Sequence, residues 1–156
     1  MLLDSQLLFS DAQAITTTAA STNVVDLVDA RDIGPGMPLE VLFAVGTAFT
    51  TDTTNASTLT ISLQGSTNAT NSGFVDYVRS PAYTAADLAA SKIVFPVDWP
   101  ALMRTAAVNQ GMPLYIRINY TVGVAAWAGG TITAGLVLGR DDAIAYPKNF
   151  SNAYPT

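Results

Sequence analysis

The chain has 156 residues, a net charge of −5 and a pI near 4.3, a length that fits one domain with an apolar core. Hydrophobic residues make up 49% of the chain and charged residues only 12%, which excludes a disordered composition. Because the seven Lys and Arg residues are scattered singly, we expect no nucleic-acid partner. We also expect neither a cleaved secretory signal nor a membrane-spanning segment.

The first half of the chain is typical of β-structure. The opening, "MLLDSQLLFSDAQAITTTAASTNVVDL", mixes short apolar runs with threonine, serine and alanine and predicts strands over 6–9, 13–17 and 23–27. "RDIGPGMP" holds two glycines and two prolines, so we interpret it as a loop. "LEVLFAVG" is nearly continuously apolar, which indicates a central or doubly buried strand. Leu59, Ile61 and Leu63 alternate with polar residues and predict a half-buried strand.

The second half continues this pattern. "GSTNATNSG" is a polar turn, "YIRINYTV" alternates over eight residues, and weaker strands are predicted over 75–79, 93–97 and 131–138. Two stretches could be helical. In 84–91, Thr84 and Asp87 imitate a capping box, and in 99–111 a proline stands in the first turn and a glycine at the end.

These eight or nine strands predict an all-β fold, a single-domain jelly roll or β-sandwich of about eight strands with at most one or two short helices. We assign 1–138 to this domain, with 1–10 as a possible N-terminal arm. Residues 139–156 contain an aromatic residue at every fourth position from 146 to 154. Prolines interrupt this spacing and would break a helix there. We interpret 139–156 as a C-terminal arm or a tail packed on its own domain.

The chain lacks the usual means of catalysis. It has no histidine and no cysteine, and no nucleophile elbow, Walker A loop or dinucleotide-binding turn is present. We therefore expect no enzyme activity, no catalytic residue, no bound metal and no cofactor. Asp26, Asp29 and Asp32 recur every three residues and are either turn or surface carboxylates or ligands of a hard cation.

Three further residues have alternative interpretations. Trp99 and Trp127 either line a sugar-binding platform or belong to a core or interface. Arg117 is either a polar-face strand residue or one half of an ion pair between subunits.

The wording and order of five segments resemble a known family. "LLFSDAQAIT", "AASTNVVDL", "RDIGPGMPLEVLFAV", "PLYIRINYTV" and "ITAGLVL" follow one another as in the capsid cement (decoration) proteins of tailed bacteriophages of the Bordetella-phage type. The resemblance covers 2–138. The stretch "WPALMRTAAVNQGM" is longer than this family's pattern, and the tail after Gly139 is an addition.

The resemblance implies a jelly roll that binds the outside of an HK97-type icosahedral capsid and joins neighbouring capsomers. The implied partners are the major capsid protein and further copies of the chain, as a dimer or trimer, and the protein would be made in the cytoplasm of the bacterial host. Alternatives are a carbohydrate-binding jelly roll of a phage particle or another non-enzymatic virion subunit. We expect the capsid or subunit interface to include Leu2, Leu3, Leu7, Leu8, Phe9, Ile33, Met37, Trp127, Tyr146, Phe150 and Tyr154.

Overall fold

The computed structural model describes residues 5–27, 39–51, 56–68, 70, 72–95, 97–98 and 111–138. Apart from one 3-10 turn, its regular elements are all strands. They are η1 (Ser5–Leu7), β1 (Leu8–Ala14), β2 (Ala19–Ala20), β3 (Val25–Asp26), β4 (Leu39–Val45), β5 (Thr50–Thr51), β6 (Thr58–Ser66), β7 (Val75–Arg79), β8 (Val97–Asp98), β9 (Tyr115–Gly123), β10 (Trp127–Gly129) and β11 (Thr131–Leu138). No helix in this described part is long and apolar enough to cross a membrane.

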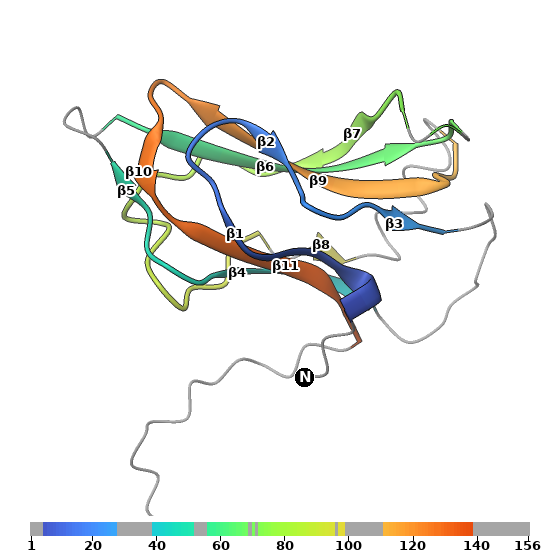
Figure 1. Cartoon of the computed structure of the whole chain (residues 1–156), viewed down its shortest axis with the longest axis horizontal. Coiled ribbons are helices and arrows are strands. Elements are labelled where there is room, and N and C mark those ends of the chain that lie inside the picture. Colours follow the sequence, from blue (N-terminus) through green and yellow to red (C-terminus); the bar gives the residue numbers. More distant parts are fainter. Residues whose placement is uncertain are drawn as a thin grey trace, which may run out of the picture.

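Two antiparallel sheets face each other (Figure 1). One has the order β1-β11-β4-β8, and the other has the order β2-β9-β6-β7 with β3 also on β9, while β5 and β10 form a small third sheet. The first strand pairs with the last, and the pairs then nest inward: β2 and β3 with β9, β4 with β8, and β6 with β7. A long hairpin rolled into two sheets has this order, so the fold is a jelly roll, as predicted.

The strongest sequence periodicities produce the strands that hold the second sheet together. β6 and β9 pair without interruption from Thr58 opposite Gly123 to Ser66 opposite Tyr115. Ile116, Ile118 and Tyr120 are fully buried, whereas Arg117 between them is partly exposed. This confirms that alternate residues of "YIRINYTV" face the core and the surface.

β4 is central in the other sheet, with β11 on one side and β8 on the other. Val41, Leu42 and Phe43 are all buried although successive side chains point to opposite faces. The doubly buried strand predicted from "LEVLFAVG" is therefore confirmed.

The opening segment is part of the domain and contributes to both sheets. The strands predicted over 6–9 and 13–17 are one strand, β1, which pairs with β11 and contains two register shifts. Ala12 has a φ of 45°, which is consistent with a bulge in this strand. The chain then crosses to the other sheet, where Ser21 donates its backbone N–H to Ile118 (2.8 Å) and β3 pairs with β9.

A hydrogen-bond network centred on Gln13 spans this crossing. Ser10 Oγ donates to Gln13 Oε1 (2.7 Å) and lies 2.8 Å from the hydroxyl of Tyr120 on β9. Gln13 Oε1 also accepts from the backbone N–H of Thr22 (3.0 Å), and Gln13 Nε2 donates to the carbonyl of Ala20 (2.8 Å). Each of these polar groups has a partner, which removes most of the penalty for placing them between the sheets.

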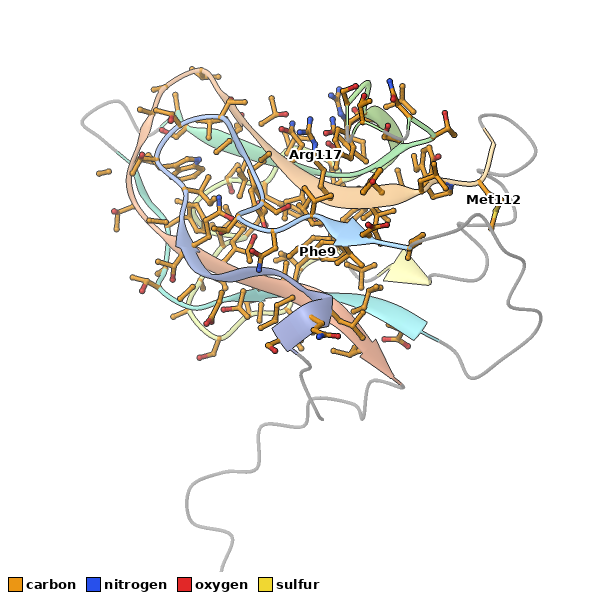
Figure 2. All side chains as sticks on the ribbon, turned by 45° about the vertical axis from the view of Figure 1, so that its right-hand side comes forward. Phe9, Met112 and Arg117 are labelled. Carbon is orange, nitrogen blue, oxygen red and sulfur yellow. The ribbon has the colours of Figure 1, made fainter. Side chains whose placement is uncertain are left out.

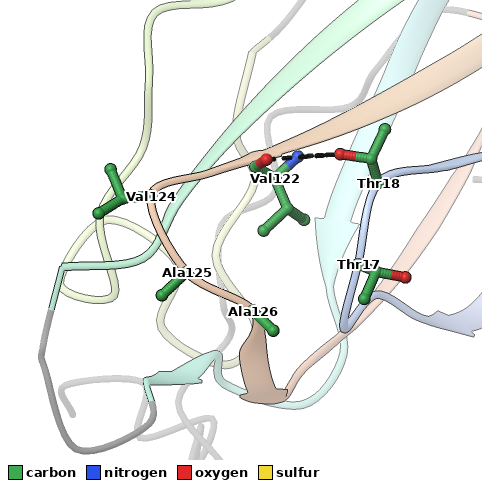
Figure 3. A pocket seen from close by; sticks show the side chains of 6 residues that line it. All are labelled: Thr17, Thr18, Val122, Val124, Ala125 and Ala126. Atoms are coloured by element: carbon green, nitrogen blue, oxygen red, sulfur yellow. Dashed lines mark hydrogen bonds between the residues drawn. The ribbon is translucent and has the colours of Figure 1, made fainter.

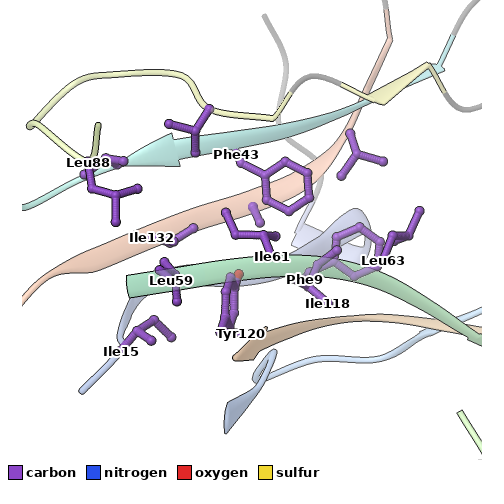
Figure 4. Close-up of a cluster of buried hydrophobic side chains, with 14 of the residues drawn as sticks. Phe9, Ile15, Phe43, Leu59, Ile61, Leu63, Leu88, Ile118, Tyr120 and Ile132 are labelled. Carbon is purple, nitrogen blue, oxygen red and sulfur yellow. The ribbon is translucent and has the colours of Figure 1, made fainter. Parts of the chain in front are cut away.

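The core fills the space between the two large sheets (Figure 4). Phe43 and Ile132 come from one sheet, and Ile61, Leu63 and Ile118 come from the other. At one side Phe49 and Trp127 pack edge to face with ring centroids 5.2 Å apart. Gly130 is required there because its φ is +146° and an added Cβ would lie 2.4 Å from Cγ of Phe49.

The predicted helix over 84–91 is wrong, although its capping interaction exists. Thr84 donates from N and Oγ1 to Asp87 Oδ2 (3.0 and 2.7 Å), and these bonds lower the pKa of Asp87. Only a turn forms. Leu88 is buried and its carbonyl accepts from Phe49, while Ser91, with a φ of 63°, donates to the carbonyl of Val45 at the edge of β4. Hydrogen bonds to Val45, the last residue of β4, and to Phe49 therefore replace the bonds that would continue a helix. The other possible helix, over 99–111, lies outside the described residues except for Gly111.

We predict that Phe9→Ala lowers the free energy of unfolding by about 3–5 kcal/mol, because the ring is fully buried. Asp11→Ala on the same strand is the control, since Asp11 is exposed and its loss should change stability by no more than about 0.5 kcal/mol. Urea unfolding followed by far-UV circular dichroism measures both. Equal effects would contradict the assignment of Phe9 to the core.

A second prediction concerns Tyr120, whose pKa is raised by burial above the ordinary tyrosine value. Above pH 10 the unfolded chain loses this proton while the folded chain keeps it, so stability falls as pH rises. Tyr120→Phe should cost about 1 kcal/mol at pH 8 through the lost hydrogen bond. Between pH 10 and 11 the free energy of unfolding of the Tyr120→Phe variant should also fall by about 1 kcal/mol less than that of the wild type. Urea unfolding of both proteins at pH 8, 10 and 11 tests this. An equal fall in the free energy of unfolding of the two proteins between pH 10 and 11 would contradict it.

Candidate functional site

The described residues contain no cluster of metal-ligating side chains. No group of three or more Asp or Glu residues in this part of the chain could hold a metal ion. Asp26 lies on β3 opposite Tyr115, whereas Asp29 and Asp32 lie outside the described residues, so the predicted alternatives for this cluster remain open. The most deeply buried titratable group, Tyr120, belongs to the network that joins the sheets.

Two of the predicted interface residues belong to the domain core, and these predictions are corrected here. Phe9 is fully buried between the sheets, because β1 is an integral strand and not a free arm. Trp127 is 2% exposed, packs on Phe49 and donates its backbone N–H to Thr16 (2.9 Å). Of the alternatives predicted for Trp127, a core position is therefore the one observed, and its Nε1 is a buried donor without a partner among the described residues.

The remaining predicted interface residues have different outcomes. Leu7 is partly buried against the core from η1, and Leu8 is half-buried at the start of β1. The others, together with Trp99, lie outside the described residues: Leu2, Leu3, Ile33, Met37, Tyr146, Phe150 and Tyr154.

The first and last described segments lie side by side. Leu8 pairs with Gly135, and η1 lies against β11 at the lower right of Figure 1. The described residues of the predicted N-terminal arm 1–10 therefore lie in η1 and β1 beside β11, whereas 1–4 and the predicted C-terminal arm, 139–156, lie outside the described residues.

The turn between β9 and β10 carries the most exposed large hydrophobic side chain of the described residues. Val124 is 83% exposed and has a φ of 68°, a conformation that is strained for a β-branched residue. It borders an open hollow of about 260 Å³ that is also lined by Thr17, Thr18, Val122, Ala125 and Ala126 (Figure 3). Thr18 Oγ1 accepts from the N–H of Val122 (2.9 Å) and so holds the two loops together. The sequence contains the apolar run "GVAAW" here, but no local signal for exposure.

A row of polar side chains crosses the outer face of the second sheet. Arg117 on β9 lies opposite Gln64 on β6, which lies opposite Asp76 on β7. Arg117 Nε donates to Gln64 Oε1 and Gln64 Nε2 donates to Asp76 Oδ1, both at 2.8 Å. Figure 2 shows Arg117 on the side of β9 that faces away from Phe9. Arg117 is thus a polar-face strand residue, the first of its two predicted roles.

Comparison with known proteins identifies a family. The model of the Bbp16 family matches residues 9–138, from β1 to the end of β11. The chain belongs to the Bbp16 family. The family name points to a protein of a Bordetella phage, in agreement with the source that the sequence resemblance suggests. A search of curated proteins gives no match. What this Bbp16 member shares with its family is the whole jelly roll and not a local motif.

The strained turn of this Bbp16 protein yields a prediction about stability. Val124→Asn should raise the free energy of unfolding by about 0.5–1 kcal/mol, because asparagine tolerates positive φ and the valine side chain makes little contact. Val75→Asn is the matched control. Val75 is the other exposed large hydrophobic residue of the described part, and it lies in β7 without a positive φ. The free energy of unfolding of the Val75→Asn variant should therefore be unchanged or lower. Urea unfolding measures both, and a destabilised Val124→Asn would contradict the strain.

Proposed function

We propose that this Bbp16 family protein is a capsid cement protein that binds the outside of an HK97-type icosahedral head and joins neighbouring capsomers. The observation that carries the proposal is the family match over 9–138, which spans both sheets. The named resemblance to phage cement proteins over 2–138 points to the same source. A described part in which no group of Asp and Glu residues could hold a metal ion is compatible with a structural role in the virion.

The proposed mechanism is physical. A protein that binds the assembled shell and not its loosened form stabilises the shell by mass action, by about 2.7 kcal/mol per site at a free concentration of one hundred times the Kd. If each oligomer, dimer or trimer, contacts more than one capsid subunit, rebinding becomes intramolecular and occupancy rises further. The proposed partners are the major capsid protein and further copies of this chain, with no role for nucleic acid, membrane or cofactor.

Several features of the domain suit this role. Few charged residues and outer strand faces rich in Thr, Ser and Asn, such as Thr60 and Asn119, favour close packing at low desolvation cost. The terminal stretches outside the described residues contain apolar side chains, Leu2 and Leu3 in one and Tyr146, Phe150 and Tyr154 in the other, and the first and last described elements, η1 and β11, lie against each other. We assign capsid contact to these terminal stretches. The carbohydrate-binding alternative loses its main support because Trp127 is buried.

The test is binding to purified shells. We expect the full chain to co-sediment with empty expanded capsids of its own phage and to raise their melting temperature. Deletion of 1–4 together with 140–156 should lower occupancy at least about tenfold, because each lost apolar side chain contributes about 1.5–3 kcal/mol when buried. The deletion ends before β1, so the domain should keep its urea midpoint. Full binding by the truncated chain would contradict the interface assignment, and no binding by the full chain would contradict the proposed function.

A further inference from the structure

Arg117 is held in place but not neutralised. Its guanidinium lies 3.9 Å from the centre of the Phe74 ring, and its Nε is bonded to Gln64. A ring below the guanidinium and an amide at Nε restrict the side chain to one orientation, so little conformational entropy remains to be lost when a partner binds.

The neighbouring carboxylate is already engaged. Asp76 Oδ1 accepts from Gln64, and Asp76 Oδ2 forms an ion pair with Arg79 at 3.0 Å. Among the described residues no carboxylate contacts Arg117, and its two terminal Nη groups form no hydrogen bond or ion pair there. The Nη edge therefore presents two parallel donors to the outside of the sheet, a geometry that matches one carboxylate.

The two arginines of this row differ in their surroundings. The Arg79 side chain is 58% exposed and paired, whereas Arg117 is partly buried, which lowers its pKa below the ordinary arginine value. The guanidinium remains protonated at neutral pH all the same. A partly desolvated cation that no carboxylate of the described residues contacts is a favourable position for an external anion.

We propose that Arg117, oriented by Phe74 and Gln64, binds an aspartate or glutamate side chain of the capsid subunit beneath the outer face of β9. This inference rests on the proposed function. A carboxylate fits better than a phosphate because Asp76 lies in the same row and opposes a doubly charged ligand. The shell fits better than a second copy because each copy carries −5 and two copies therefore repel each other.

The experiment compares two substitutions that remove the same charge from the same face. Arg117→Gln should weaken binding to purified shells about tenfold or more, since it removes a partly desolvated charge pair. Arg79→Gln should change the affinity less than about threefold, because an exposed ion pair contributes little. Arg117→Lys, which keeps the charge but not the two-donor fork, should be intermediate. Unchanged urea midpoints establish that the variants are folded.

Each other outcome has a defined meaning. Equal affinity of the wild type and Arg117→Gln would overturn this inference and leave the proposed function intact, whereas absence of wild-type binding would overturn both. A change in oligomer mass by light scattering, with shell affinity unchanged, would assign Arg117 to contact between copies and also overturn it. A cryo-electron microscopy map of the decorated shell should show a capsid carboxylate within about 3 Å of the Arg117 Nη atoms, and a neutral side chain there would contradict the proposal.

Discussion

The fold depends on how its first strand is joined to both sheets. β1 pairs with β11, and the residues that follow it cross to β9, with Gln13 accepting or donating hydrogen bonds on both sides of the crossing. Ser10 and Tyr120 extend this network across the core. In a jelly roll the first and last strands close the nested pairs, so loss of β1 would leave β11 with an open edge and expose the core beneath Phe9. The polar network is stabilising because each of its groups is paired, which also makes it sensitive to removal of one member.

This construction leaves specific surfaces for function. The inward faces of β6 and β9 are filled largely by Leu, Ile and Tyr side chains of the core, which leaves the outside of the sheets and their ends for recognition of a ligand. The described surface offers an apolar, strained turn at Val124 and the ordered row that ends in Arg117. Both suit contact with another macromolecule better than binding of a small molecule, since neither encloses a deep cavity. A domain that acts by covering a protein surface needs little more.

Prediction from the sequence succeeded where a local pattern matched the tertiary environment. The bounds predicted for β7 and β11 are those observed, and the alternation in β9 identified its buried residues, because one face of each strand meets the core. It failed where a partner distant in sequence decided the outcome. Residues 84–91 contain a genuine capping pair, but the backbone of Leu88 bonds to Phe49 and that of Ser91 bonds to Val45 at the end of β4. Phe9 looked like part of an arm because β1 is interrupted by bulges, and these conceal its period. Trp127 carries no local sign that Phe49, far away in the chain, covers it.

The sequence by itself therefore determined the all-β class, the strongest strands, the absence of histidine and cysteine chemistry, and the family resemblance. These properties depend on composition and on patterns within about ten residues. Only the tertiary structure decided that Phe9 of the opening segment lies in the core, that η1 lies against β11, and that Arg117 stacks on Phe74 and bonds to Gln64. Those facts depend on the register between strands that lie far apart in the sequence, such as the first strand, β1, and the last, β11. Strand pairing brings such residues together through backbone hydrogen bonds, which carry no side-chain signature in the sequence.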